Sequence, residues 1–261
     1  MLADYHMHTN FSDDSTCEME AEIKRSIALG LDEICFTEHV DYGVKTDLNC
    51  NYSEYRKEFN RCKEKYKDKI TLKFGIEFGM QVNTIDEFQK DFYENDFDFV
   101  ILSCHQVDNN EFWRQDFQRG KTQKEYNEKY YEEILKVIKR YDDYSVLGHL
   151  DMIKRYDMKG SYPFEKLKDI ITEILRHIIS RGKGIEINTS SYRYKLDDLT
   201  PSRDILKLYK ELGGRIITIG SDTHKEEHIA YKILEVRKEL KKLGFKQFCT
   251  FEKMKPIFHD L

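Results

Sequence analysis

Residues 3–9, ADYHMHT, close a short predicted β-strand with two histidines, and this kind of ending recurs along the chain. The other apolar runs that end in histidine or an acid are ICFTEH (34–39), ILSCH (101–105), SVLGHLD (145–151) and ITIGSDTH (217–224). Side chains alternate along a strand, so His6 and His8 are expected on the same side. Because equivalent ends of parallel strands meet at one rim, these imidazoles and carboxylates predict a site for several metal ions.

Between these stretches the chain alternates predicted strands with predicted helices. Residues 18–29 are typical of the helices, since Met19, Ile23 and Ile27 share one face and Gly30 ends it. After a first strand closed by His6, strands are expected at residues 34–37, 70–78, 97–103, 145–149, 184–188 and 215–220, with a short last strand at 245–249. Helices are expected at residues 18–29, 52–67, 84–95, 122–141, 164–180, 200–212 and 226–243.

Two of these helices carry a start signal. Thr84 is the expected N-cap of one helix, with Glu87 completing a capping box. Thr200 followed by Pro201 predicts the start of another. The alternation predicts parallel strands with crossover helices. Seven such units, with polar clusters at the carboxyl ends of the strands, favour a β/α barrel, whose chemistry gathers at that rim. An open sheet would place its site at one switch point instead.

The bulk composition is typical of a soluble globular protein. The 261 residues are 39% hydrophobic and 35% charged, which suits one large domain or two small ones. The net charge of −5 argues against broad nucleic-acid binding, although bound divalent metals would still attract an anionic substrate. No apolar run approaches the roughly 20 residues that cross a bilayer. The six cysteines form no CxxC pair, so we expect reduced thiols and a cytoplasmic protein with no membrane partner, in an oligomeric state that is left open.

Read in chain order, the motifs are HMHTNFSDDS, TEH, GIEFG, SCH, GHLD and GSDTH. Together they resemble the PHP family, named for polymerase and histidinol phosphatase domains, from His6 to His224. The resemblance implies a distorted seven-stranded β/α barrel of the PHP type that carries three divalent metal ions. We expect it to form a single domain over residues 1–261.

The resemblance also implies, position by position, which side chains hold each metal. The ligands of the first metal would be His6, His8, Glu77 and Asp222. The ligands of the second would be His105, His149 and a bridging Glu77. The ligands of the third would be Asp14, His39 and His224, with Asp13 as the neighbouring alternative to Asp14. Such sites accept zinc, manganese and iron alike, so the native metal is left open.

A chain of this length with the whole motif set resembles the histidinol-phosphatase branch, since longer members carry polymerase domains. We therefore expect a metal-dependent phosphomonoesterase that converts L-histidinol phosphate to L-histidinol and phosphate in histidine biosynthesis. Neighbouring metal ions activate water and clamp a phosphoryl group. Arg155 and Arg193, in GHLDMIKRY and EINTSSYRY, are expected on its oxygens. The proton donor to the leaving group stays open between Asp222, His224 and metal-bound water.

Two other functions are compatible with the motifs. The first is a PHP phosphoesterase that acts on another small phosphate, a nucleotide or phosphotyrosine. The second is a metal-binding module without catalysis, which is less favoured because every motif is populated. Turnover of the three kinds of substrate would separate the first from histidinol-phosphatase activity.

The stretch 107–121 is a long polar and aromatic connection of the size that often serves as a lid. Trp113 and Asp116 are its candidate contacts to the imidazole ring and ammonium group of the substrate, and Trp113 could equally pack the lid against the barrel.

The remaining polar residues near the motifs are assigned ordinary roles. Glu38 and Asp151 are candidates to orient ligand imidazoles. His177, His228 and His259 are expected to be ordinary surface or core histidines.

Overall fold

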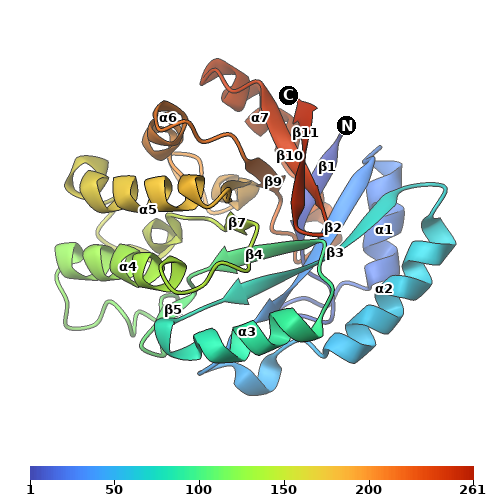
Figure 1. Cartoon of the computed structure of the whole chain (residues 1–261), viewed down its shortest axis with the longest axis horizontal. Helices are drawn as coiled ribbons and strands as arrows, with labels where there is room; N and C mark the ends of the chain where they lie inside the picture. Colours follow the sequence, from blue (N-terminus) through green and yellow to red (C-terminus); the bar gives the residue numbers. More distant parts are fainter.

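The computed structural model describes residues 1–261 and is built on one sheet of seven parallel strands. In spatial order the strands are β1 (Ala3–Met7), β2 (Glu33–Val40), β3 (Thr71–Gly79), β4 (Phe99–Ser103), β7 (Val146–Leu147), β8 (Gly184–Asn188) and β9 (Ile217–Gly220). The connecting helices are α1 (Met19–Ala28), α2 (Tyr52–Tyr66), α3 (Ile85–Glu94), α4 (Gln123–Ile138), α5 (Lys168–Ser180), α6 (Arg203–Glu211) and α7 (Ile233–Lys242). They surround the sheet, with α1 and α2 near β2 and β3 and with α4 and α5 at the opposite end of the molecule (Figure 1).

The sheet closes almost completely into a barrel at the carboxyl ends of its first and last strands. The His8 amide donates to the Thr223 carbonyl at 2.9 Å, and the Thr223 amide donates to the His6 carbonyl at 3.3 Å. The barrel is distorted because β7 has two residues and the pairing of β1 with β2 shifts between Asp4 and Met7. The predicted seven-stranded β/α barrel is therefore confirmed.

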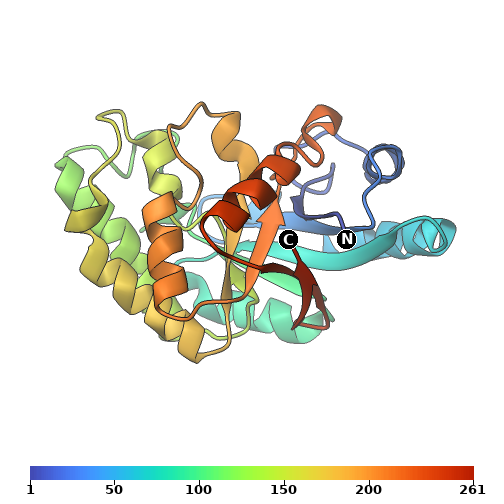
Figure 2. The same ribbon diagram turned by 90° about the horizontal axis from the view of Figure 1, so that it is seen from above.

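A C-terminal hairpin covers the amino end of the barrel, where a single short strand was expected. It pairs β10 (Gln247–Glu252) with β11 (Lys255–Asp260). Phe251 packs on Phe99 with ring centroids 5.0 Å apart, and its amide donates to the Tyr5 hydroxyl at 2.8 Å. The two termini lie close together (Figure 2), and Arg237 donates to the carbonyls of both Met1 and Asp260.

The predicted start of α6 is wrong because tertiary contacts hold the segment before it extended. The Asn188 amide donates to the Thr200 carbonyl at 2.8 Å, so Thr200 pairs with β8 and does not cap a helix. The helix begins at Arg203, and Ser202 is its N-cap, accepting from the Ile205 amide at 3.4 Å.

Two further helix starts differ in part from the sequence pattern. Thr84 is the N-cap residue of α3, as expected, but its side chain makes no capping bond to that helix and instead forms a capping box with Gln81, one turn earlier. The predicted helix 226–243 is interrupted, since Ala230 and Lys232 adopt left-handed backbone conformations and α7 begins after them.

The predicted lid segment contains a small hairpin of β5 (Gln106–Val107) and β6 (Asn110–Glu111) followed by turns. A membrane-spanning helix would need a longer and more apolar stretch than any of these helices has.

Candidate metal centre

Glu77, near the carboxyl end of β3, lies at the centre of a buried group of imidazoles. Its Oε2 atom is 3.1 Å from Nε2 of His6, 3.4 Å from Nε2 of His8 and 3.0 Å from Nδ1 of His39. These contacts follow from the sheet, since His39 is the register partner of Glu77 across β2 and β3. The side chains of Glu77, His6 and His8 have no exposed surface.

The other oxygen of Glu77 faces two imidazoles from the opposite half of the barrel. Oε1 lies 2.9 Å from Nε2 of His149 and 3.3 Å from Nε2 of His105. It also accepts a hydrogen bond from the Ser103 hydroxyl at 2.6 Å. One carboxylate therefore contacts five histidines, which is the arrangement expected of a ligand shared between two cations.

Two aspartates and His224 complete the rim. Oδ1 of Asp222 is 3.7 Å from Nε2 of His6 and 3.6 Å from Nε2 of His8. Asp222 has a left-handed backbone (φ 55°), a strained conformation of the kind that gathers at functional sites. Nε2 of His224 lies 3.2 Å from Oδ2 of Asp14.

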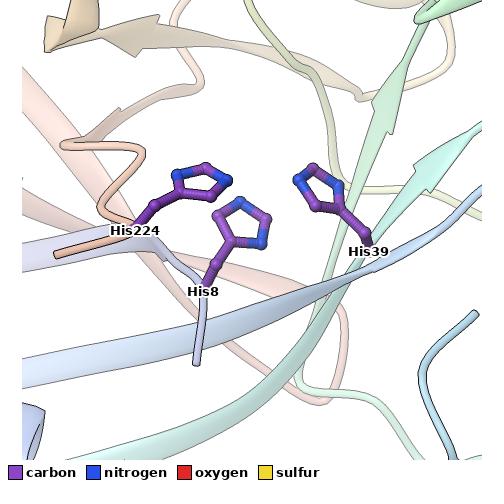
Figure 3. A group of neighbouring side chains, drawn as sticks. All are labelled: His8, His39 and His224. Atoms are coloured by element: carbon purple, nitrogen blue, oxygen red, sulfur yellow. The ribbon is translucent and has the colours of Figure 1, made fainter. Parts of the chain in front are cut away.

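The imidazoles of His8, His39 and His224 converge from three different segments (Figure 3). Nε2 of His39 lies 3.6 Å from Asp14, whereas its Nδ1 faces Glu77. The sequence grouped His39 with Asp14 and His224; in the structure it reaches both that pair and the central carboxylate.

The chemistry of these donors fits divalent metal ions. Three groups have ligand atoms within 4.8 Å of one another: His6, His8 and Asp222; His39, Glu77 and His105; and His8, His39 and His224. Nε2 of His8 and Nδ1 of His39 are buried, and although Oε2 of Glu77 lies 3.4 and 3.0 Å away, neither nitrogen makes a hydrogen bond of good geometry. A buried nitrogen without a partner is costly, and a metal ion would use its lone pair.

The protonation equilibria show how strongly these groups act on one another. Burial lowers the pKa of His8 well below its ordinary value, and the neighbouring imidazoles add to this, which favours a neutral ring with a free lone pair. Burial also opposes charging of His39 and His105, but nearby carboxylates outweigh it and raise their pKa values to about 9 and about 10. Although burial acts the other way, the surrounding imidazoles hold the pKa of Glu77 well below its usual range.

Two further carboxylates each contact the imidazole of an expected ligand, and the sequence reasoning missed both. Oε1 of Glu186 lies 2.5 Å from Nδ1 of His6, and Oδ1 of Asp41 lies 2.9 Å from Nδ1 of His105. The alternation that paired His6 with His8 also places Asp41 on the side of His39, so this signal was present. Glu186 is an acid in the middle of an apolar strand, which is also unusual enough to notice.

The two acids that were expected to orient ligands behave differently. Glu38 accepts from the Ser12 hydroxyl at 2.6 Å, and Ser12 in turn contacts Nδ1 of His8 at 3.2 Å, so Glu38 acts on His8 through one hydroxyl. Asp151 instead accepts from Lys154 and from the Ser202 amide, away from the metal ligands.

Glycines make room for these contacts at two positions. A Cβ at residue 220 would overlap the side chain of His6, and one at residue 79 would overlap the Asp41 carboxylate that supports His105. Neither neighbour is a loose chain end, so both close approaches require glycine.

An open cavity of about 460 Å³ lies above the buried ligands. Seven of the nine expected metal ligands line it, and His6 and His8 lie buried beside Glu77. The rest of its wall consists of Asp41, Lys45, Trp113, Met152, Arg155, Tyr156, Arg193, Tyr194, Lys225 and His228.

The two arginines are held in different ways. Nη2 of Arg155 donates to the Ser190 hydroxyl at 2.5 Å, and its buried Nε has no partner. Arg193 donates to the backbone carbonyls of Ser221 and Asp222 at 2.6 and 2.7 Å. Arg193 therefore supports the loop that carries Asp222 as well as lining the cavity.

The lid segment contributes Trp113 to the cavity but not Asp116. The Trp113 ring lies 5.2 Å from Nζ of Lys45, and both residues line the wall. Asp116 pairs with Arg119 at 2.8 Å and is not part of the lining, so the expected acidic contact from this residue is wrong. His228, expected to be an ordinary histidine, does line the cavity.

Comparison with known proteins points to one family. Residues 4–190 match the family model described as "PHP domain". A Lactococcus lactis protein named "Histidinol-phosphatase" is 36% identical over 97% of this chain and 95% of its own length. A Clostridium acetobutylicum protein named "Probable histidinol-phosphatase" is 32% identical over 100% and 97%.

A solved structure matches nearly the whole fold. The crystal structure of histidinol phosphate phosphatase from Lactococcus lactis, complexed with zinc, L-histidinol and phosphate, has a TM-score of 0.88 and 35% identity, and the match covers 98% of each chain.

Proposed function

Because this chain belongs to the PHP domain family, we propose that it hydrolyses L-histidinol phosphate to L-histidinol and phosphate, a step of histidine biosynthesis. The observation that carries the proposal is the full-length likeness to the Lactococcus lactis enzyme whose structure contains zinc, L-histidinol and phosphate. The rim of acids and imidazoles lies at the place in the barrel where such chemistry is expected.

Three divalent ions, of zinc, manganese or iron, are proposed at this rim. The first would be held by His6, His8, Glu77 and Asp222, the second by Glu77, His105 and His149, and the third by Asp14, His39 and His224. Divalent ions in such sites supply a water nucleophile at neutral pH and neutralise a phosphoryl group. Two of the three ligand groups found by geometry include His39, which supports a compact cluster with this histidine between its members.

The chain's own residues bind and orient the substrate. Arg155 and Arg193 are proposed to donate to the phosphate oxygens, because a guanidinium presents paired N–H groups to an anion. Trp113 is proposed to contact the imidazole or ammonium end of the substrate. Asp222 would be ionised as a metal ligand and could then only accept, so of the two candidates His224, whose Nδ1 lies 3.6 Å from Oδ1 of Asp222, is proposed to deliver a proton to the leaving oxygen.

The proposed enzyme is one domain over residues 1–261. The family model ends at residue 190, yet Asp222 and His224 lie beyond it, and they contact His6 of β1 and Asp14 of the following loop. A small phosphorylated partner follows from the proposal, and no nucleic-acid binding is expected. The cytoplasmic location remains a prediction from cysteine usage.

Side-by-side kinetics test the substrate. The metal-loaded protein is expected to turn over histidinol phosphate with a kcat/KM at least about 100-fold above that for a nucleoside monophosphate or phosphotyrosine, a difference of about 2.7 kcal/mol at the transition state. A higher kcat/KM for either comparison substrate would contradict the proposal. A folded, metal-loaded protein with no turnover would support the non-catalytic alternative.

Metal removal tests the cofactor. Dialysis against a chelator is expected to abolish turnover, and zinc, manganese or iron should restore it. Elemental analysis of the restored protein should find three ions per chain. Turnover that survives exhaustive chelation, or a fully active protein with fewer than three ions, would contradict this part of the proposal.

A further inference from the structure

Glu186 is a fully buried acid at the centre of β8, and its two oxygens serve two different proposed ligands. Oε1 accepts from Nδ1 of His6 at 2.5 Å. Oε2 accepts from the backbone amide of His149 at 2.9 Å and from Nδ2 of Asn188 at 3.3 Å. One carboxylate thus connects a proposed ligand of the first metal with one of the second.

The surrounding backbone leaves room for this carboxylate. A Cβ at Gly220, the last residue of β9, would lie 2.6 Å from Oε1 of Glu186. A Cβ at Gly148, beside β7, would lie 3.6 Å from Oε2, which is an ordinary van der Waals contact. The approach of β9 to Glu186 therefore requires the glycine at residue 220, whereas Glu186 sets no such requirement at Gly148.

The contact with His6 also decides which nitrogen of this ring faces the cluster. An ionised carboxylate can only accept, so Nδ1 carries a proton, and in the metal-loaded protein Nε2 would be left to donate its lone pair to the ion. That Nε2 lies 3.1 Å from Glu77 and 3.7 Å from Asp222. A carboxylate behind a histidine ligand fixes the ring and increases its basicity as a donor.

We propose that Glu186 is a positioning residue that sets the metal affinity of this centre by holding His6 and the His149 backbone together. The inference rests on the proposed metal site. β1 and β7 are not neighbours in the sheet, and β8 and β9 lie between them around the nearly closed seam. Glu186 contacts both segments with one side chain and so holds a proposed ligand of each metal in position relative to the other.

Asp41 provides a matched comparison. It is also a buried carboxylate, and it supports Nδ1 of His105 at 2.9 Å. It makes no contact with a second imidazole or with the backbone of another proposed ligand. Replacing Asp41 should therefore weaken the hold on one ligand, whereas replacing Glu186 should weaken two.

The test compares Glu186→Gln with Asp41→Asn, both close in shape to the native side chains. Zinc affinity is measured by competition with a chromogenic chelator, and the visible spectrum is recorded after loading with cobalt(II). Glu186→Gln is expected to weaken zinc binding about 10- to 100-fold and to change the cobalt spectrum. Asp41→Asn should weaken zinc binding less. Melting of the metal-free proteins reports general damage to the fold.

Wild-type zinc affinity and a wild-type cobalt spectrum in Glu186→Gln would overturn the inference. If that variant does not fold, Glu186→Asp keeps the charge but is too short to reach both partners, and an intermediate zinc affinity is expected. Unchanged affinity in a folded Glu186→Asp would also overturn it. These readouts need no substrate, so a protein that binds zinc as expected but fails to hydrolyse histidinol phosphate refutes the proposed function and not this inference.

Discussion

Oδ2 of Asp14 lies 3.2 Å from Nε2 of His224, which joins the loop after β1 to the end of β9. The adjacent Asp13 turns away and pairs with Nζ of Lys45 at 2.8 Å. Burial would raise the pKa of the Asp14 carboxyl, but His39 and His224 hold it well below its ordinary value. Asp14 is therefore an ionised neighbour of two imidazoles, as a metal ligand would be.

Asp14→Asn is expected to reduce kcat/KM for histidinol phosphate by on the order of 100-fold or more, because a lost ligand removes several kcal/mol of charge stabilisation. Asp13→Asn removes the ion pair with Lys45, a residue of the cavity wall, and should reduce kcat/KM far less. Elemental analysis should find fewer ions in Asp14→Asn alone. The opposite ranking of the two variants would assign the ligand to Asp13.

The two arginines should separate binding of phosphate from support of the metal site. Arg155→Ala removes a charged donor with a free Nε and also the ion pair of Nη2 with Oδ2 of Asp222 at 3.7 Å, so kcat/KM should fall about 10- to 100-fold with only a small loss of zinc affinity. Arg193→Ala releases the carbonyls of Ser221 and Asp222, so it should lower kcat/KM and should lower zinc affinity more than Arg155→Ala does. A larger loss of zinc affinity in Arg155→Ala than in Arg193→Ala would contradict this assignment.

Trp113→Ala is expected to raise KM for histidinol phosphate about 2- to 30-fold, the range of a cation–π contact. Steady-state kinetics with p-nitrophenyl phosphate, which has neither imidazole nor ammonium, should show a smaller change. Asp116→Asn serves as the control, since Asp116 pairs with Arg119 outside the cavity. An equal rise of KM for both substrates would indicate that Trp113 packs the lid against the barrel and does not contact the imidazole or ammonium group of the substrate.

Glu22 on α1 should make the stability of the metal-free protein depend on pH. Both of its carboxylate oxygens are buried without a hydrogen-bond partner. Burial first, and then Glu38, raise its pKa well above the ordinary value of 4.5. Because the folded state holds this proton more tightly than the unfolded one, the associated stability is present below about pH 4.5 and is lost as the pH rises through the folded-state pKa.

Glu22→Met should remove that dependence. In chelator at about pH 8 the variant is expected to be more stable than the wild type by about 1–3 kcal/mol, the cost of an unsatisfied buried polar group, with a smaller difference near pH 5. Thermal or urea melts at both pH values measure this, and Glu18→Gln, an exposed change on the same segment, is the control. An equal difference in stability between Glu22→Met and wild type at both pH values would contradict the expectation.

The sequence by itself indicated which strands carry the candidate functional side chains. His6 and His8, Glu77, His149 and Asp222 each follow or close an apolar run, and alternation along a strand fixes which side they take. Since parallel strands end at one rim, their meeting could be expected without coordinates, and a barrel could be favoured over an open sheet, whereas its closure depends on contacts between the first and last strands. The same local patterns located most helices, because their apolar faces repeat at helical spacing.

Only the tertiary structure decided which acids stand behind the ligands and where some helices begin. Glu186 reaches His6 from a strand far along the chain, and Asp14 lies beside His224 while Asp13 pairs with Lys45. Thr200 does not begin a helix, because its carbonyl accepts a hydrogen bond from the Asn188 amide. Each of these results depends on contacts between segments that are distant in sequence, and the energy of such contacts cannot be inferred from local sequence patterns.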